Sequence, residues 1–162
     1  MDRIAIDGLW GRTVQKVAGS PAFARVGPHV VPPVDRALHR LTGGRVLLSR
    51  ALLPGLVLTT TGRRSGLSRE SPLMCVPEPE GTWLVLGSNF GQTHHPAWTA
   101  NLLARPEASI SYGREDIPVT AELLEGEARA TAWDRATAIW PTFDRYAARA
   151  ERQIRVFRLH RT

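Results

Sequence analysis

Three short β-prone segments follow one another with only tight turns between them, and they constrain the fold more than any other feature. The segments are LVLTTT (56–61), SPLMCVP (71–77) and TWLVLGS (82–88). A glycine-containing loop separates the first two, and PEPEG separates the last two. Apolar and β-branched runs bounded by Gly and Pro are typical of strands joined by hairpin turns. Residues 56–88 therefore predict three consecutive antiparallel strands.

The second half of the chain repeats this pattern between helical segments. We expect strands at ASISY (108–112), IPVTAELL (117–124) and IRVFRL (154–159), the first two joined by a turn at GRED. We expect helices at HPAWTANLLARP (95–106), EGEARATAWDRATAIW (125–140) and TFDRYAARAER (142–152), with Pro141 interrupting the last two. Strands and helices do not alternate, so a parallel doubly wound sheet is disfavoured. The pattern predicts a small antiparallel barrel with peripheral helices.

The first fifty residues have helical patterns broken by Pro and Gly. Ser20-Pro21 can open a helix that Gly27-Pro28 ends. In PVDRALHRLTGG (33–44) the apolar residues recur at helical spacing, and Gly43 can serve as the C-cap. We expect an N-terminal helical extension at 1–33 and one domain at 34–162.

Charge and cysteine content bound the location and the partners. The 162 residues carry 21 Lys+Arg against 15 Asp+Glu, a net charge of +6, and Lys16 is the only lysine. This excess favours an anionic ligand, nucleic acid or an acidic membrane surface. The single Cys75 excludes an intramolecular disulfide, and the start MDRIAIDGLW lacks the order of a secretory signal. We expect a cytoplasmic protein whose basic N-terminal region is a candidate for peripheral membrane contact.

The stretch TTTGRRSGLSRES (59–71), here called the arginine loop, combines three arginines, two glycines and six hydroxyl side chains. One interpretation is a solvated hairpin tip or a generic contact to a nucleic-acid backbone. The other is an anion site in which backbone N–H groups, Ser65 and the guanidinium groups bind phosphate. The loop holds no aromatic side chain, which disfavours single-stranded nucleic acid.

Two further patterns are open to a structural or a functional interpretation. In GSNFGQTHHPAWTANL (87–102) a strand leads through a glycine-bearing loop into a helix start that could supply donors, or Trp98 could be plain core. His94 and His95 are adjacent and lack ligand spacing, so no metal site is expected. Trp140, Phe143 and Tyr146 recur every three residues, which is typical of a core stripe and also fits a lid over a planar ligand.

Three motifs in this order resemble the deazaflavin-dependent nitroreductase family, a split β-barrel group that uses coenzyme F-420, an 8-hydroxy-5-deazaflavin. They are TTTGRRSGLSRESPL, LGSNFGQTHHPAWTANLLARP and WPTFDRYAARAERQIRVF, and the similarity runs from about residue 34 to 159. The first two motifs are specific as a pair. The resemblance implies an α+β, mainly β, fold: a six-stranded antiparallel split β-barrel with peripheral helices.

The resemblance also implies where the coenzyme lies. The phosphate and the acidic tail would be held by Arg63, Arg64, Ser65 and Arg69. The strand beside the deazaflavin ring would be Glu70, Ser71, Pro72, Leu73 and Met74. The neighbouring strand end would cradle the ring through Leu86, Gly87, Ser88 and Asn89, and the other wall would be Ala97, Trp98 and Asn101.

In such an enzyme the reduced coenzyme delivers a hydride to a lipophilic acceptor such as a quinone, an enone or a nitroaromatic. Ser88 and Tyr146 are the candidate proton donors, and Trp140, Phe143 and Tyr146 would line the substrate pocket. Family members often carry tyrosines where this chain has Trp140 and Phe143, which favours a more apolar pocket and a bulky acceptor.

Several alternatives remain open at this point. They are an FMN-dependent split-barrel oxidoreductase, a non-catalytic deazaflavin carrier and a phosphate-backbone binding module. We expect a small-molecule electron acceptor rather than nucleic acid as partner, and either a monomer or a homodimer.

Overall fold

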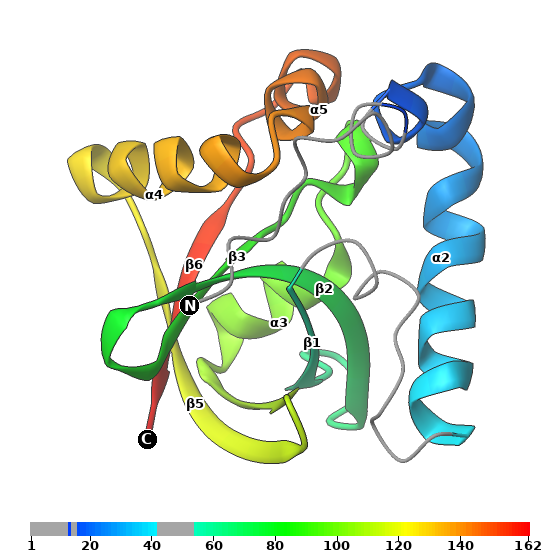
Figure 1. Ribbon diagram of the computed structural model, residues 1–162. Coiled ribbons are helices and arrows are strands. Elements are labelled where there is room, and N and C mark those ends of the chain that lie inside the picture. Colours follow the sequence, from blue (N-terminus) through cyan, green and yellow to red (C-terminus); the bar gives the residue numbers. More distant parts are fainter. Residues whose placement is uncertain (1–12, 14–15, 42–53) are drawn as a thin grey trace.

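The computed structural model describes residues 13, 16–41 and 54–162, and its centre is a β-barrel (Figure 1). The strands are β1 (Gly55–Thr61), β2 (Ser68–Glu78), β3 (Thr82–Leu86), β4 (Glu107–Tyr112), β5 (Glu115–Leu123) and β6 (Val156–Arg161). They close in the order β1-β2-β3-β6-β5-β4, and every pairing is antiparallel. The predicted fold class is confirmed.

Several strand boundaries differ from the prediction by one to three residues, and pairing partners explain the start of β2 and of β6. β2 begins at Ser68 rather than Ser71, since Ser68 pairs with Thr61 and extends the first hairpin. β6 begins at Val156 rather than Ile154, because its partner β3 ends at Leu86, which pairs with Val156. The first change shortens the turn of the arginine loop to residues 62–67.

Alternating side chains build one core inside the barrel and a second one on its outer wall. Inside lie Leu56, Leu58, Cys75, Trp83, Val85, Ile110, Ile117, Val119, Phe157 and Leu159. Helix α3 (Ala97–Ala104) adds Trp98 and Leu102 to this core, with the Trp98 ring 5.7 Å from that of Phe157. The outer core joins Leu84, Leu86 and Val156 to helices α4 (Gly126–Ile139) and α5 (Thr142–Ala150), which lie across one end of the barrel (Figure 1).

Helix α2 (Pro21–Leu41) stands along the side of the barrel as one continuous helix (Figure 1). The prediction that Gly27-Pro28 ends it was wrong. Pro28 has no N–H, so the Ala24 carbonyl lacks its helical partner. Gln92, 68 residues away, donates from Nε2 to that oxygen at 2.8 Å. This bond supplies what the proline removes, so the helix continues.

The continuity of α2 bears on the expected domain division. The helix runs through residue 33, so the predicted boundary between an extension at 1–33 and a domain at 34–162 falls inside it. The predicted cap at Gly43 lies outside the described residues.

Candidate functional site

The turn of the arginine loop is closed by its own backbone. Gly62 N–H donates to Leu67 O at 2.7 Å, and Gly66 N–H donates to Gly62 O at 2.7 Å. Gly66 has a φ of +69°, and a Cβ on Gly62 would lie 2.6 Å from the Ser65 hydroxyl. The positive φ favours glycine at position 66, and a side chain at position 62 would displace the Ser65 hydroxyl.

The cations of this loop are exposed and carry no counter-charge within the described part of the chain. Arg63, Arg64 and Arg69 have no carboxylate partner there. Ser65 Oγ accepts from the Leu67 N–H at 3.3 Å and from Arg69 at 3.5 Å. Adjacent guanidinium groups and a hydroxyl form a donor set that fits phosphate and carboxylate oxygens. The chemistry of this turn therefore suits a ligand with a phosphodiester and an acidic tail.

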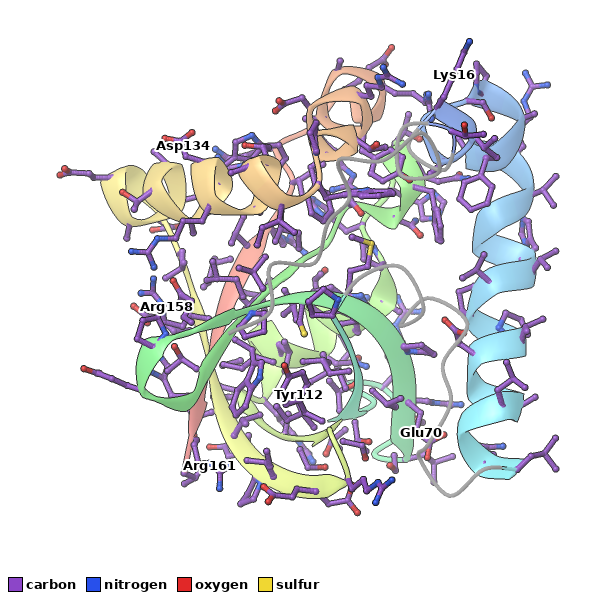
Figure 2. The ribbon with its side chains drawn as sticks, viewed as in Figure 1. Lys16, Glu70, Tyr112, Asp134, Arg158 and Arg161 are labelled. Carbon is purple, nitrogen blue, oxygen red and sulfur yellow. The ribbon has the colours of Figure 1, made fainter. Side chains whose placement is uncertain are left out.

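The following strand meets α2 at Glu70. Arg40 Nη2 lies 3.1 Å from the Glu70 carboxylate, and Figure 2 shows Glu70 on the side of the barrel that faces the end of α2. Arg40 is largely exposed, so this ion pair contributes little to stability. It shows that the edge of the predicted coenzyme strand lies against α2.

Asn101 joins the arginine loop to α3. Its side chain is buried, with Oδ1 accepting from the Arg63 N–H at 3.1 Å and Nδ2 donating to Thr60 Oγ1 at 3.0 Å. The structure thus brings Asn101 together with the predicted phosphate site. Trp98, which was predicted to line the same wall, lies in the barrel core, and Ala97 is exposed at the start of the helix.

The loop after β3 adopts an unusual backbone. Asn89, Phe90 and Gly91 have φ values of 48°, 56° and 76°, and we call these residues the left-handed turn. Non-glycine residues adopt such angles at a cost, and they cluster at functional sites. A Cβ on Gly91 would lie 3.1 Å from the Tyr146 backbone. The turn is therefore packed tightly against α5.

Arg152 holds this loop, and the sequence contains no signal for it. Its guanidinium donates to Gly87 O at 3.1 Å, Ser88 O at 3.2 Å and Gln92 O at 3.1 Å. It also lies 3.0 Å from His95 Nδ1. These partners are about 60 residues away in a chain rich in arginine, so no local pattern marks Arg152.

His95 is held in its neutral form. Burial lowers the pKa of His95 below its ordinary value, and the positive charges of Arg152 and Arg155 lower it further. A neutral ring lets Nδ1 accept a hydrogen bond from Arg152. The histidine thus belongs to the support of the loop.

Two of the predicted substrate residues, Trp140 and Phe143, lie next to the predicted coenzyme strands β2 and β3. Met74 of β2 and Leu86 of β3 share a narrow apolar pocket with Trp140 and Phe143 from the junction of α4 and α5. Trp140 is 4% exposed, and its indole N–H has no hydrogen-bond partner within the described residues. The structure therefore brings residues of the two predicted sets together around one pocket.

Tyr146 is buried in the same core, and its proton is already used. Its hydroxyl donates to Ala18 O at 3.0 Å. Burial raises the pKa of Tyr146 to about 12, against the opposing charge of Arg149. The indole N–H of Trp140 opposes this rise more weakly and lies outside hydrogen-bond geometry. The phenol therefore keeps its proton near neutral pH and shares it with the N-terminal segment.

Ser88, the other predicted proton donor, has a hydroxyl that is not occupied as that of Tyr146 is. It is half-buried at the start of the left-handed turn, and its hydroxyl makes no hydrogen bond with any described residue. Its carbonyl accepts from the Gly91 N–H at 2.9 Å as well as from Arg152. The backbone of Ser88 is thus held while its hydroxyl stays free to donate.

Comparison with known proteins places these features in a family. The family model described as F420H(2)-dependent quinone reductase matches residues 34–160. The F420H(2)-dependent quinone reductase Rv1261c of Mycobacterium tuberculosis is 31% identical over 90 residues, which are 55% of this chain and 60% of that relative. This match spans about three fifths of the length of the curated relative.

Solved structures show the same relationship. One described as an F420-H2 dependent reductase, FDR-A, is 36% identical with a TM-score of 0.60, covering 66% of this chain and 94% of its own. Another, described as a domain-swapped dimer, is 35% identical with a TM-score of 0.63, covering 77% of this chain and 92% of its own.

Proposed function

This chain belongs to the F420H(2)-dependent quinone reductase family, and on that premise we propose that it transfers a hydride from reduced coenzyme F-420 to a lipophilic quinone. The reduced coenzyme supplies the hydride when it is bound. The protein's own residues bind the coenzyme, orient it, exclude water and place a proton.

The arginine loop is the proposed binding site for the phosphate and the acidic tail of the coenzyme. Arg63, Arg64 and Arg69 are exposed without carboxylate partners in the described part of the chain, and Ser65 adds a hydroxyl. Each charge-assisted hydrogen bond to a phosphate contributes roughly 1.5–3 kcal/mol where water is partly excluded, and less in full exposure. Three such groups, two on the turn and Arg69 at the start of β2, would anchor a phosphodiester with a glutamate tail.

The proposal of a quinone as the electron acceptor rests on the pocket between Met74, Leu86, Trp140 and Phe143. It is apolar, and Trp140, one of its lining residues, has a buried indole N–H that lacks a hydrogen-bond partner among the described residues. An unpaired buried donor costs about 1–3 kcal/mol, which an acceptor oxygen from a ligand would recover. A quinone has an apolar planar body with carbonyl oxygens, which matches the apolar lining. The cavity is only about 10 Å³, so a quinone would enter only after Trp140 or Phe143 moves aside. Enones and nitroaromatics share these features and belong in the same acceptor panel.

Hydride addition to a quinone leaves negative charge on an oxygen, which needs a proton donor. We propose Ser88 for this role because its hydroxyl has no partner in the described structure. Tyr146 can act only if its bond to Ala18 opens, because that bond occupies its proton.

A direct assay tests the function. Purified protein is mixed with reduced F-420 and menadione, and the reappearance of the oxidised coenzyme is followed by absorbance. Calorimetry measures binding of the coenzyme separately. Absence of F-420 binding would end the proposal, and tight binding without turnover of any acceptor would indicate a carrier. A yellow, FMN-loaded preparation would favour the FMN alternative, and salt-sensitive oligonucleotide binding without F-420 affinity would favour the nucleic-acid alternative.

We also propose that α2 contacts a lipid surface. No helix within residues 16–41 and 54–162 is long and apolar enough to cross a membrane. However, α2 exposes Val26, Val30, Val34 and Leu41, which fall on one face at helical spacing. Flotation with phosphatidylserine-containing vesicles tests this contact, and equal recovery with and without vesicles would refute it.

The oligomeric state is a separate proposal. The solved relative described as a domain-swapped dimer favours a homodimer over a monomer for this chain. Light scattering on the purified protein distinguishes the two.

A further inference from the structure

The left-handed turn at residues 89–91 requires support from outside itself. Asn89 and Phe90 both have positive φ, a conformation that non-glycine residues keep only when the surrounding structure holds it. The bonds within the loop, from Gly91 N–H to Ser88 O and from Gln92 N–H to Asn89 O, close it locally. They do not connect it to the rest of the protein.

Arg152 connects the loop to the protein on both sides of the turn. Arg149 Nη1 adds a longer contact to Phe90 O at 3.5 Å, and the Phe90 ring packs on Phe23 and Tyr146. Arg152 binds the carbonyls of Gly87 and Ser88, which precede the turn, and the carbonyl of Gln92, which follows it. The guanidinium is partly buried, and no carboxylate of the described residues pairs with it. A rigid planar fork with several donors can hold such a set of acceptors, whereas an ammonium group cannot.

The backbone donors of the same loop are left unused. Within the described residues, the N–H groups of Ser88, Asn89 and Phe90 make no hydrogen bond. The three residues are half-buried, so these donors are available to water in the ligand-free protein and to acceptor atoms of a bound ligand. Consecutive N–H groups around left-handed residues form a concave donor surface of this kind.

We infer that Arg152 is a positioning residue for the coenzyme. By holding the carbonyls of Gly87, Ser88 and Gln92 it leaves the N–H groups of residues 88–90 for acceptor atoms of the deazaflavin ring. This role rests on the proposed function, because the ligand is the coenzyme of that reaction. Arg152 itself touches neither coenzyme nor acceptor and acts through the loop.

The test compares Arg152→Ala and Arg152→Lys with the matched control Arg129→Ala. Arg129 is also half-buried and also donates to a backbone carbonyl, that of Ile154 at 2.9 Å, but from α4. Calorimetry measures the dissociation constant for F-420, and native-state hydrogen exchange measures protection of the Gly91 and Gln92 amides in the ligand-free protein.

For Arg152→Ala we expect the F-420 dissociation constant to rise about tenfold, which is about 1.4 kcal/mol, and the two amides to lose protection. Added guanidinium ion should restore much of the affinity to this variant and none to Arg129→Ala, which should lose thermal stability but keep its affinity. Arg152→Lys should recover only part of the affinity. If Arg152→Ala fails to fold, the lysine variant carries the test through the same two measurements.

An unchanged dissociation constant and unchanged amide protection in the Arg152 variants would overturn the inference. A loss of F-420 affinity in Arg129→Ala as large as that in Arg152→Ala would overturn it as well. Failure of the proposed function looks different, because the unsubstituted protein would then not bind F-420 at all. The hydrogen-exchange comparison would still report whether Arg152 holds the loop.

Discussion

Replacement of Tyr146 by Phe separates a structural from a catalytic role for this phenol. The substitution keeps the ring, whose centroid lies 6.3 Å from those of Phe90 and Phe143, and removes only the hydroxyl. The hydroxyl donates at 3.0 Å to the carbonyl of Ala18, a residue that is 8% exposed. Its loss therefore leaves a buried acceptor without a donor.

The expected magnitudes differ widely between the two roles. An unsatisfied buried carbonyl costs about 1–3 kcal/mol. For a chain of this size, a loss of about 2 kcal/mol lowers the Tm by roughly 4–8 °C. A general acid, in contrast, contributes about 10²–10⁴-fold to the rate. Since the phenol proton is committed to Ala18, we expect the Tm of Tyr146→Phe to fall while kcat stays within about threefold.

Scanning calorimetry gives the Tm, and turnover of reduced F-420 with saturating menadione gives kcat. Ser88→Ala is the comparison variant, for which we expect a large loss of kcat with little change in Tm. A hundredfold or greater loss of kcat in Tyr146→Phe at unchanged Tm would refute the reasoning, on the scale of a lost general acid. It would mean that the Ala18 contact opens in the working enzyme.

Three further predictions concern the coenzyme site and its support. The double variant Arg64→Ala, Arg69→Ala should bind F-420 about tenfold or more weakly with its Tm almost unchanged, because both side chains are exposed; parallel losses measured by calorimetry would show that the turn is structural. Gly91→Ala should lower the Tm and the F-420 affinity together, since its φ is +76° and the new Cβ would lie 3.1 Å from the Tyr146 backbone; a Tm equal to that of the unsubstituted protein would contradict this strain. Because the pKa of His95 is lowered from 6.5, its contribution to stability is complete above about pH 6.5 and is lost as the pH falls toward the lowered pKa. Denaturant unfolding from pH 7.5 to 5 should show this loss, and His95→Asn should reduce it; identical pH profiles would exclude His95 as the cause.

The strands were predictable because their signals are local. Gly62 and Gly66 mark the first hairpin turn, and Gly113 marks the turn between β4 and β5, where its φ is +70°. Each turn depends on the conformational freedom of residues within it. The family follows from motifs of the same local kind, and its prediction is confirmed by the match over 34–160.

The helix at Gly27-Pro28 was mispredicted for the opposite reason. The local sequence contains a helix breaker, and the compensating donor is Gln92, 68 residues along the chain. Arg152 was not predicted for the same reason. It binds backbone carbonyls that are distant in the sequence and that only the fold brings close to it.

By itself, the sequence determined the hairpin order and the donor chemistry of the arginine loop, since both depend on neighbouring residues. Only the tertiary structure decided what the buried polar groups bind. The phenol of Tyr146 is directed to Ala18, and the amide of Asn101 to the loop backbone. The physical reason is that a buried donor or acceptor must be satisfied by whichever group packing places beside it, and that group is set by contacts between distant parts of the chain.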